Sequence, residues 1–186
     1  MVQRDLVERV RRGEHEAFDA LARLVSGRLF AVAYRIVRDH YLAEDAVQQA
    51  LIMIWNELLR LRDPERFDAW TYRLIVRSSV AEARRERRGG ASIQLLPEDS
   101  DVSPAPDQYR AVADRDQLER GFRRLTPEQR AILVLQHYAG QSLAEIADVL
   151  GIPVGTAGSR LHYATRALRA ALEADGRNVA AEGRLA

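Results

Sequence analysis

The residues best suited to chemistry lie between positions 153 and 168, where hydroxyl, imidazole and guanidinium groups recur at helical spacing. In a helix, one face of this segment would carry Thr156, Ser159, Arg160, His162, Tyr163 and Arg166. Short polar groups near the start of such a helix reach base edges in the major groove, and arginine binds guanine or phosphate. The other face would carry the packed residues Ala157, Leu161, Ala164 and Leu168. The pattern therefore favours binding of duplex DNA, and the alternative is a helix pair in an ordinary bundle.

Two helices that would position this segment are predicted from their capping sequences. The first begins in the segment TPEQ at 126–129, with threonine as the cap, proline at the first helical position and glutamine three residues after the cap. The second begins at Ser142, where Glu145 completes a capping box, and it ends at the GIP turn at 151–153. Its apolar stripe comprises Leu143, Ile146, Ala147 and Leu150. A short helix, a three-residue turn and a basic helix predict a helix-turn-helix.

Residues 125–168 closely resemble the C-terminal promoter-binding domain of the extracytoplasmic-function (ECF) sigma factors of bacterial RNA polymerase. Much of residues 5–88 is similar to the N-terminal domain of the same family, and the two motif blocks stand in the family's order. The resemblance implies that the C-terminal domain binds the minus-35 promoter element as duplex DNA. The residues it implies for this contact are Pro153, Val154, Thr156, Ser159, Arg160, His162 and Arg166. Gly158 departs from the family pattern, in which lysine is common, and one DNA contact is lost with it.

A second surface is predicted on the segment LAEDAVQQALIMIWNELLRL at 42–61. Val47, Leu51, Ile54, Leu58 and Leu61 recur as a buried seam. The pattern alone indicates an exposed face of carboxylates and amides beside an isoleucine. The resemblance implies that this face binds core RNA polymerase at the clamp helices of the β′ subunit, and the β flap is a further expected contact of the factor. The implied polymerase-binding residues are Glu44, Asp45, Gln48, Gln49, Ile52 and Trp55, of which Gln49 departs from the family's glutamate.

A third surface is predicted from a basic stripe at steps of four, seven and four residues, formed by Arg73, Arg77, Arg84 and Arg88. Basic groups beside aromatic rings hold single-stranded DNA, whereas the alternative is a solvated helix face. The segment FDAWTYRL at 67–74 resembles the family segment that melts and reads the minus-10 element, and the loop at 61–68 would capture a flipped base. The implied minus-10 residues are Phe67, Trp70, Tyr72, Arg73, Arg77 and Arg84, and Arg77 stands where many members have asparagine. Of the aromatic residues, Tyr72 is the predicted stacking platform and Trp70 a predicted core residue.

The fold predicted from these patterns is all-α, with two small helical domains joined by a flexible linker. The predicted divisions are a sigma region 2 domain at 1–88, an acidic proline-containing linker at 89–117, a sigma region 4 helix-turn-helix domain at 118–172 and a frayed tail at 173–186. A short first helix should end near Gly13, and a long second one should bury a stripe from Phe18 to Ile36. A further helix is expected at about 69–87. The resemblance implies that the linker enters the active-site cleft of the polymerase, whereas simple solvation is the alternative.

Composition limits the remaining function classes. The chain has 186 residues, a formal net charge of +1 and no cysteine, which excludes disulfides and thiol nucleophiles. The four histidines lack metal-ligand spacing, and no phosphate-binding glycine loop is present, so neither an enzyme nor a cofactor is expected. No signal-peptide core or membrane-spanning apolar run is present, which predicts a cytoplasmic protein without membrane insertion.

Two hypotheses about partners remain from the sequence. A sigma factor would bind core polymerase and promoter DNA, both duplex and single-stranded, and most family members also bind an anti-sigma factor. A dimeric repressor with the same helix-turn-helix would instead bind a palindromic duplex without polymerase, and it would need a dimer seam in its N-terminal half. Two motif blocks in family order favour the sigma factor.

Overall fold

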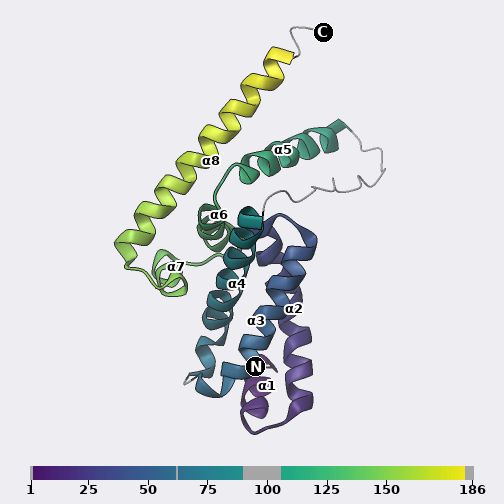
Figure 1. The fold of residues 1–186 in the computed structure, drawn as a ribbon, viewed down its shortest axis with the longest axis vertical. Coiled ribbons are helices and arrows are strands. Elements are labelled where there is room, and N and C mark those ends of the chain that lie inside the picture. Colours follow the sequence, from purple (N-terminus) through teal and green to yellow (C-terminus); the bar gives the residue numbers. More distant parts are fainter. Residues whose placement is uncertain (1, 62, 90–105, 183–186) are drawn as a thin grey trace.

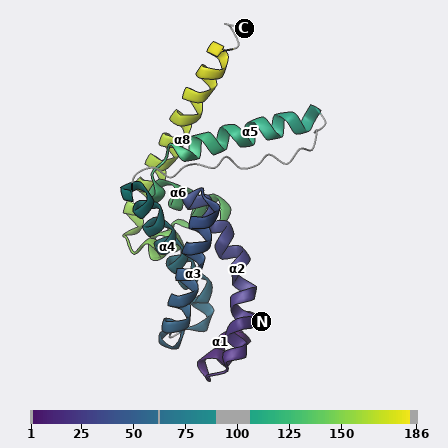
Figure 2. The ribbon, with the colours of Figure 1, turned by 45° about the vertical axis from the view of Figure 1, so that its right-hand side comes forward.

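The computed structural model describes residues 2–61, 63–89 and 106–182, and the regular structure in these ranges is helical throughout (Figure 1). The predicted all-α class with two helical domains is therefore confirmed. Helices α2, α3 and α4 form an elongated bundle, while α5 and α8 extend from one end of it in both views (Figure 1, Figure 2). Helix α1 and the last turns of α8 lie at opposite ends of the molecule (Figure 1).

The N-terminal bundle is built around the predicted apolar stripes. Its elements are α1 (Val2–Arg11), α2 (His15–Val37), α3 (His40–Glu57), two 3₁₀ turns (Leu58–Arg60 and Pro64–Arg66) and α4 (Phe67–Gly89). The stripe of α2 is buried, since Leu21, Val25, Leu29, Val32 and Ile36 are at most 2% exposed. Gly13 permits the tight turn after α1 with φ +90°, and the Asp39 side chain caps α3 by accepting a 2.9 Å hydrogen bond from the amide of Leu42.

The C-terminal domain contains the predicted helix-turn-helix. Its elements are α5 (Pro106–Arg123), α6 (Pro127–Leu133), a π turn (Val134–Tyr138), α7 (Leu143–Leu150) and α8 (Val154–Glu182). Both predicted capping boxes form, because Thr126 pairs with Gln129 and Ser142 pairs with Glu145 in each direction. Gly151 ends α7 in the left-handed conformation with φ 64°. These local signals placed the start of α6, both ends of α7 and the start of α8 correctly.

Helix α5 begins at Pro106, inside the segment predicted as the linker at 89–117. This helix is stabilised by packing on α8, which no local pattern reveals. The Gln117 side chain donates a 3.2 Å hydrogen bond to the carbonyl of Leu172. Gly121 lets the two helices approach closely, since a Cβ atom there would lie 2.8 Å from Leu172 Cδ2. The segment at 90–105, with most of the predicted acidic linker, lies outside the described residues.

Helix α8 continues to Glu182, into the segment predicted as the tail at 173–186. Once a helix has formed, each further residue adds a backbone hydrogen bond at little cost, so an extension needs no apolar stripe of its own. Residues 183–186 lie outside the described residues.

The two domains lie against each other. Helix α4 contacts both α6 and α7, and α2 contacts α6 and the π turn. Figure 1 and Figure 2 both show α6 and α7 beside α4. No local pattern predicts this contact, since it joins residues far apart in the chain.

Candidate polymerase and nucleic-acid interfaces

The first part of α8 presents the predicted DNA-binding face to solvent. The exposed members of this face are Pro153, Val154, Ser159, Arg160, His162, Tyr163 and Arg166, while Thr156 is half-buried. On the opposite side, Ala157 and Ala164 are fully buried against the rest of the domain. The Ser159 hydroxyl donates to the carbonyl of Thr156 at 3.0 Å and can still accept a hydrogen bond from outside. A rigid helix therefore displays basic and hydroxyl groups together.

The predicted polymerase-binding face of α3 is also open. Each of its six residues is exposed: Glu44, Asp45, Gln48, Gln49, Ile52 and Trp55. Between them the buried residues Val47, Ala50 and Ile54 hold the helix on the bundle. Ile52 is 47% exposed and Trp55 is 42% exposed, which is unusual for large apolar side chains among acids and amides.

Trp55 is held in place by the neighbouring helix. Its ring packs edge-on against Phe18 with 4.7 Å between ring centroids, and against His15 at 5.3 Å. It also lines a hollow of about 450 Å³ beside the turn at Gly13, together with Val10 and Leu59. A half-exposed aromatic residue fixed on one side is suited to anchoring a partner.

The arginines of α4 are exposed along its length. Arg73, Arg77, Arg84 and Arg88 all face outward, as the stripe predicts. The loop before them is held by α1, because Arg4 binds Glu65 at 2.6 Å and Gln3 donates to Asp68 at 2.9 Å.

Among the aromatic residues of α4, Tyr72 differs from the prediction, whereas Trp70 packs against the core as predicted. Tyr72 is only 8% exposed and lies under the Arg28 guanidinium, 5.3 Å from the ring centroid, so it offers no open stacking surface here. Burial also raises the pKa of the Tyr72 hydroxyl. Phe67 is fully buried and serves the core, whereas Trp70 is half-buried and more accessible than Tyr72.

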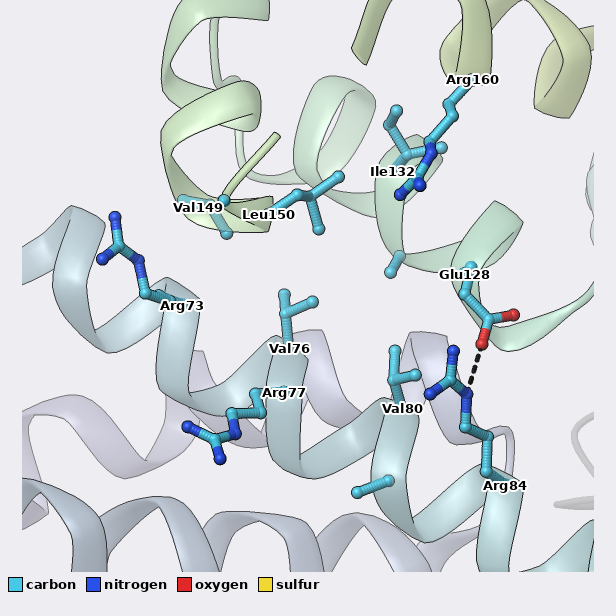
Figure 3. Close-up of a pocket in the computed structure, with 13 residues that line it drawn as sticks. Arg73, Val76, Arg77, Val80, Arg84, Glu128, Ile132, Val149, Leu150 and Arg160 are labelled. Atoms are coloured by element: carbon cyan, nitrogen blue, oxygen red, sulfur yellow. Dashed lines mark hydrogen bonds and ion pairs between the residues drawn. The ribbon is translucent and has the colours of Figure 1, made fainter. Parts of the chain in front are cut away.

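A hollow of about 560 Å³ separates α4 from the C-terminal domain. It brings predicted DNA contacts of both domains together, because Arg73, Arg77 and Arg84 line one side and Arg160 the other (Figure 3). Sequence reasoning missed the residues that pair across this boundary, above all Asp148. No periodicity marks such pairs, since their partners lie on different domains.

Other classes of site find no support in the described ranges. Within residues 2–61, 63–89 and 106–182, no three His, Cys, Asp or Glu side chains are grouped so that they could hold a metal ion. None of the helices described is long and apolar enough to cross a membrane.

Comparisons with known proteins identify both domains. Residues 21–89 match the family model described as Sigma-70 region 2, and residues 115–168 match Sigma-70, region 4. The ECF RNA polymerase sigma factor SigL of Mycobacterium tuberculosis strain H37Rv is 36% identical over 151 residues, covering 78% of this chain and 82% of that protein. This chain belongs to the ECF sigma factors.

As a member of that family, this sigma factor directs promoter-specific initiation of transcription. It is also similar to the RNA polymerase sigma-H factor of Pseudomonas aeruginosa, with 31% identity over 189 residues, 90% of this chain and 92% of that one. Its fold resembles CnrH in the complex with the cytosolic domain of CnrY, with a TM-score of 0.64, 23% identity, and coverage of 94% and 99%. RpoE in complex with the anti-sigma factor NepR from Bartonella quintana gives the same TM-score at 22% identity, over 85% and 98% of the chains.

Gly158, which departs from the family pattern, lowers the stability of α8. A Cβ atom there would lie 3.5 Å from Leu143 Cδ2, an ordinary van der Waals contact. Glycine inside a helix costs about 1 kcal/mol relative to alanine, so we expect Gly158→Ala to raise the free energy of unfolding by about that amount. Urea-induced unfolding followed by circular dichroism measures it.

Gly151→Ala is the matched control for Gly158→Ala. Because Gly151 has φ +64°, alanine there should lower the free energy of unfolding by about 1 kcal/mol or more. A loss of stability in both variants would mean that Gly158 is required by packing, which contradicts the prediction.

Proposed function

We propose that this sigma factor uses three separate surfaces in transcription initiation, each for a different partner. The exposed face of α3 binds the clamp helices of the β′ subunit, the arginine stripe of α4 binds the melted minus-10 strand, and the face of α8 binds the minus-35 duplex. The proposal rests mainly on the α3 face, where exposed acids and amides surround the exposed side chains of Ile52 and Trp55. An apolar centre with a polar rim is the usual composition of a protein-binding surface.

The exposure of the aromatic residues of α4 indicates which of them to test as the stacking residue for the minus-10 strand. Trp70, at the start of the arginine stripe, is half-buried and packs against the core, but it is less buried than Tyr72, which lies under Arg28. Stacking of a base on an aromatic ring is worth roughly 1–3 kcal/mol, which makes Trp70 the residue to test first.

The remaining partners follow from family membership and stay proposals. The C-terminal domain would reach the β flap, and an anti-sigma factor would hold the protein away from polymerase. The similar RpoE structure from Bartonella quintana is a complex with the anti-sigma factor NepR. The factor would act in the cytoplasm, where the polymerase is. RNA synthesis would remain the reaction of the polymerase, since the sigma factor has no catalytic step of its own.

Co-purification with core polymerase and run-off transcription on fragments of its own genome test the proposal. Stable binding and promoter-specific transcripts are expected. If the protein does not bind polymerase but binds a palindromic duplex tightly as a dimer, it is a repressor. The proposed role of the α3 face in polymerase binding would then be wrong.

A further inference from the structure

One carboxylate of the C-terminal domain binds two arginines of the N-terminal domain. Asp148, on α7, accepts from Arg66 Nη2 at 2.8 Å with one carboxylate oxygen and from Arg73 Nη2 at 3.0 Å with the other. The Arg73 guanidinium also donates to the carbonyl of Asp148 at 2.7 Å. Two guanidinium groups around one anion is the arrangement that a DNA phosphate would require from the same side chains.

A second carboxylate occupies the other end of the arginine stripe. Glu128, on α6, accepts a 2.7 Å hydrogen bond from Arg84 Nε (Figure 3). Burial raises the pKa of Glu128, but hydrogen bonds from its own backbone amide and from Arg84 outweigh this and lower the pKa, which keeps the carboxylate charged. Along a helix, eleven residues span about 16 Å, so the acids engage both ends of a long stretch of α4.

Apolar contacts and two further pairs support the same closure. Val76 and Val80 point from α4 toward the C-terminal domain, where Leu150 lies opposite (Figure 3). The Arg35 guanidinium of α2 lies 3.7 Å from the centroid of the Tyr138 ring. The paired side chains of Arg38 and Glu119 are 12% and 29% exposed, which shields them from solvent more than the pairs on α4.

This arrangement is incompatible with simultaneous binding of both promoter elements. The elements at minus-35 and minus-10 are about 25 base pairs apart, or roughly 85 Å along B-form DNA at 3.4 Å per base pair. Arg73 and Arg160 nevertheless line one hollow of about 560 Å³. The domains must therefore separate before the factor can bind a promoter as proposed above.

The closed arrangement also contains an unfavourable group that limits its stability. Arg130 is only 6% exposed, and its Nε atom has no hydrogen-bond partner. Burial, with the nearby charges of Arg87 and Arg38, lowers the pKa of Arg130 to about 10. A buried Nε–H group without an acceptor opposes closure, whereas the ion pairs on α4 favour it.

We propose that this sigma factor inhibits itself, with Asp148 and Glu128 occupying the arginines that would otherwise bind the phosphates of the minus-10 strand. The proposal rests on the proposed function of the α4 stripe. Promoter DNA and the domain's own acids would then compete for the same guanidinium groups. Because the α4 pairs are exposed, salt should weaken the closure.

The test removes the two acids without touching a proposed DNA contact. We expect Asp148→Asn combined with Glu128→Gln to tighten binding of the full-length factor to a 20-nucleotide oligothymidylate. If about one molecule in ten is open in the wild type, the gain is about tenfold. The control, Glu16→Gln with Asp19→Asn, removes two exposed acids from α2 and the same net charge. An equal gain in the control would overturn the proposal.

Closure itself is measured by energy transfer between two dyes. Because the chain has no cysteine, residues introduced as Arg23→Cys and Arg169→Cys, both at exposed positions, label selectively. Energy transfer should fall in the double variant and in high salt, and a dye distance unchanged in both would overturn the proposal.

Further variants distinguish a failure of the proposed closure from a failure of the proposed DNA-binding role of the α4 stripe. Glu128→Arg should open the molecule, and adding Arg84→Glu should close it again, which a misfolded protein would not do. If Arg73→Ala leaves oligothymidylate binding of the opened variant unchanged, the proposed function of the stripe fails while the closure is still tested by the dyes.

Discussion

Replacement of Asp45 by alanine is expected to weaken binding of core RNA polymerase about 30-fold or more, because truncating one partner of a buried interfacial charge pair costs roughly 2–5 kcal/mol. Asp45 is exposed on α3 beside Gln48, in the centre of the proposed polymerase-binding face. The fold should be unaffected, since its side chain points away from the bundle. Fluorescence anisotropy of the labelled factor titrated with core polymerase gives the dissociation constant.

Asp116→Ala is the matched control for Asp45→Ala. It removes an exposed acid of the same type from α5, in the other domain. Unchanged polymerase affinity in Asp45→Ala, with a normal unfolding curve, would show that the α3 face is not the contact. An equal loss in both variants would point to a general effect of charge.

Replacement of Arg160 by alanine is expected to have the second large effect, on minus-35 recognition. An arginine that binds a guanine edge contributes about 1–3 kcal/mol, so binding of the minus-35 duplex should weaken about 5- to 150-fold. Polymerase binding should be unchanged, because Arg160 lies on α8 and the proposed polymerase face lies on α3. Gel-shift titrations on the promoter found by run-off transcription measure the loss.

The control for Arg160→Ala lies on the same helix. Arg169 is exposed as well, but nine residues further along, which at 100° per residue places it on the opposite side. Loss of specificity at one base position is expected for Arg160→Ala only. A uniform loss on all sequences, with a salt dependence reduced by about one phosphate contact, would instead assign Arg160 to the DNA backbone.

Local signals in the sequence predicted local structure well. The caps at Thr126 and Ser142 depend on residues within three positions, and Gly151 ends α7 through its own backbone conformation. The exposed faces of α3 and α8 followed from helical periodicity, because a single helix determines which residues share a side. Such features need no knowledge of distant parts of the chain.

Features that depend on tertiary contacts could not be predicted in the same way. Tyr72 and Trp70 are two residues apart, and the burial of Tyr72 depends on α2, which supplies Arg28 above its ring. Helix α5 has a weak pattern of its own and is stabilised by α8 through Gly121. No sequence pattern distinguishes Asp148 from other polar residues of short helices, because its two arginine partners lie in the other domain.

The covalent link between the domains has a consequence for how weak their contact can be. Residues 90–105 span at most about 60 Å when fully extended, so each domain experiences the other at an effective concentration in the millimolar range. Exposed pairs such as Arg66–Asp148 therefore need only a dissociation constant about tenfold below that concentration to keep about nine molecules in ten closed. The same two domains, cut apart and mixed at micromolar concentration, would scarcely associate, and dilution of the intact factor would not open it.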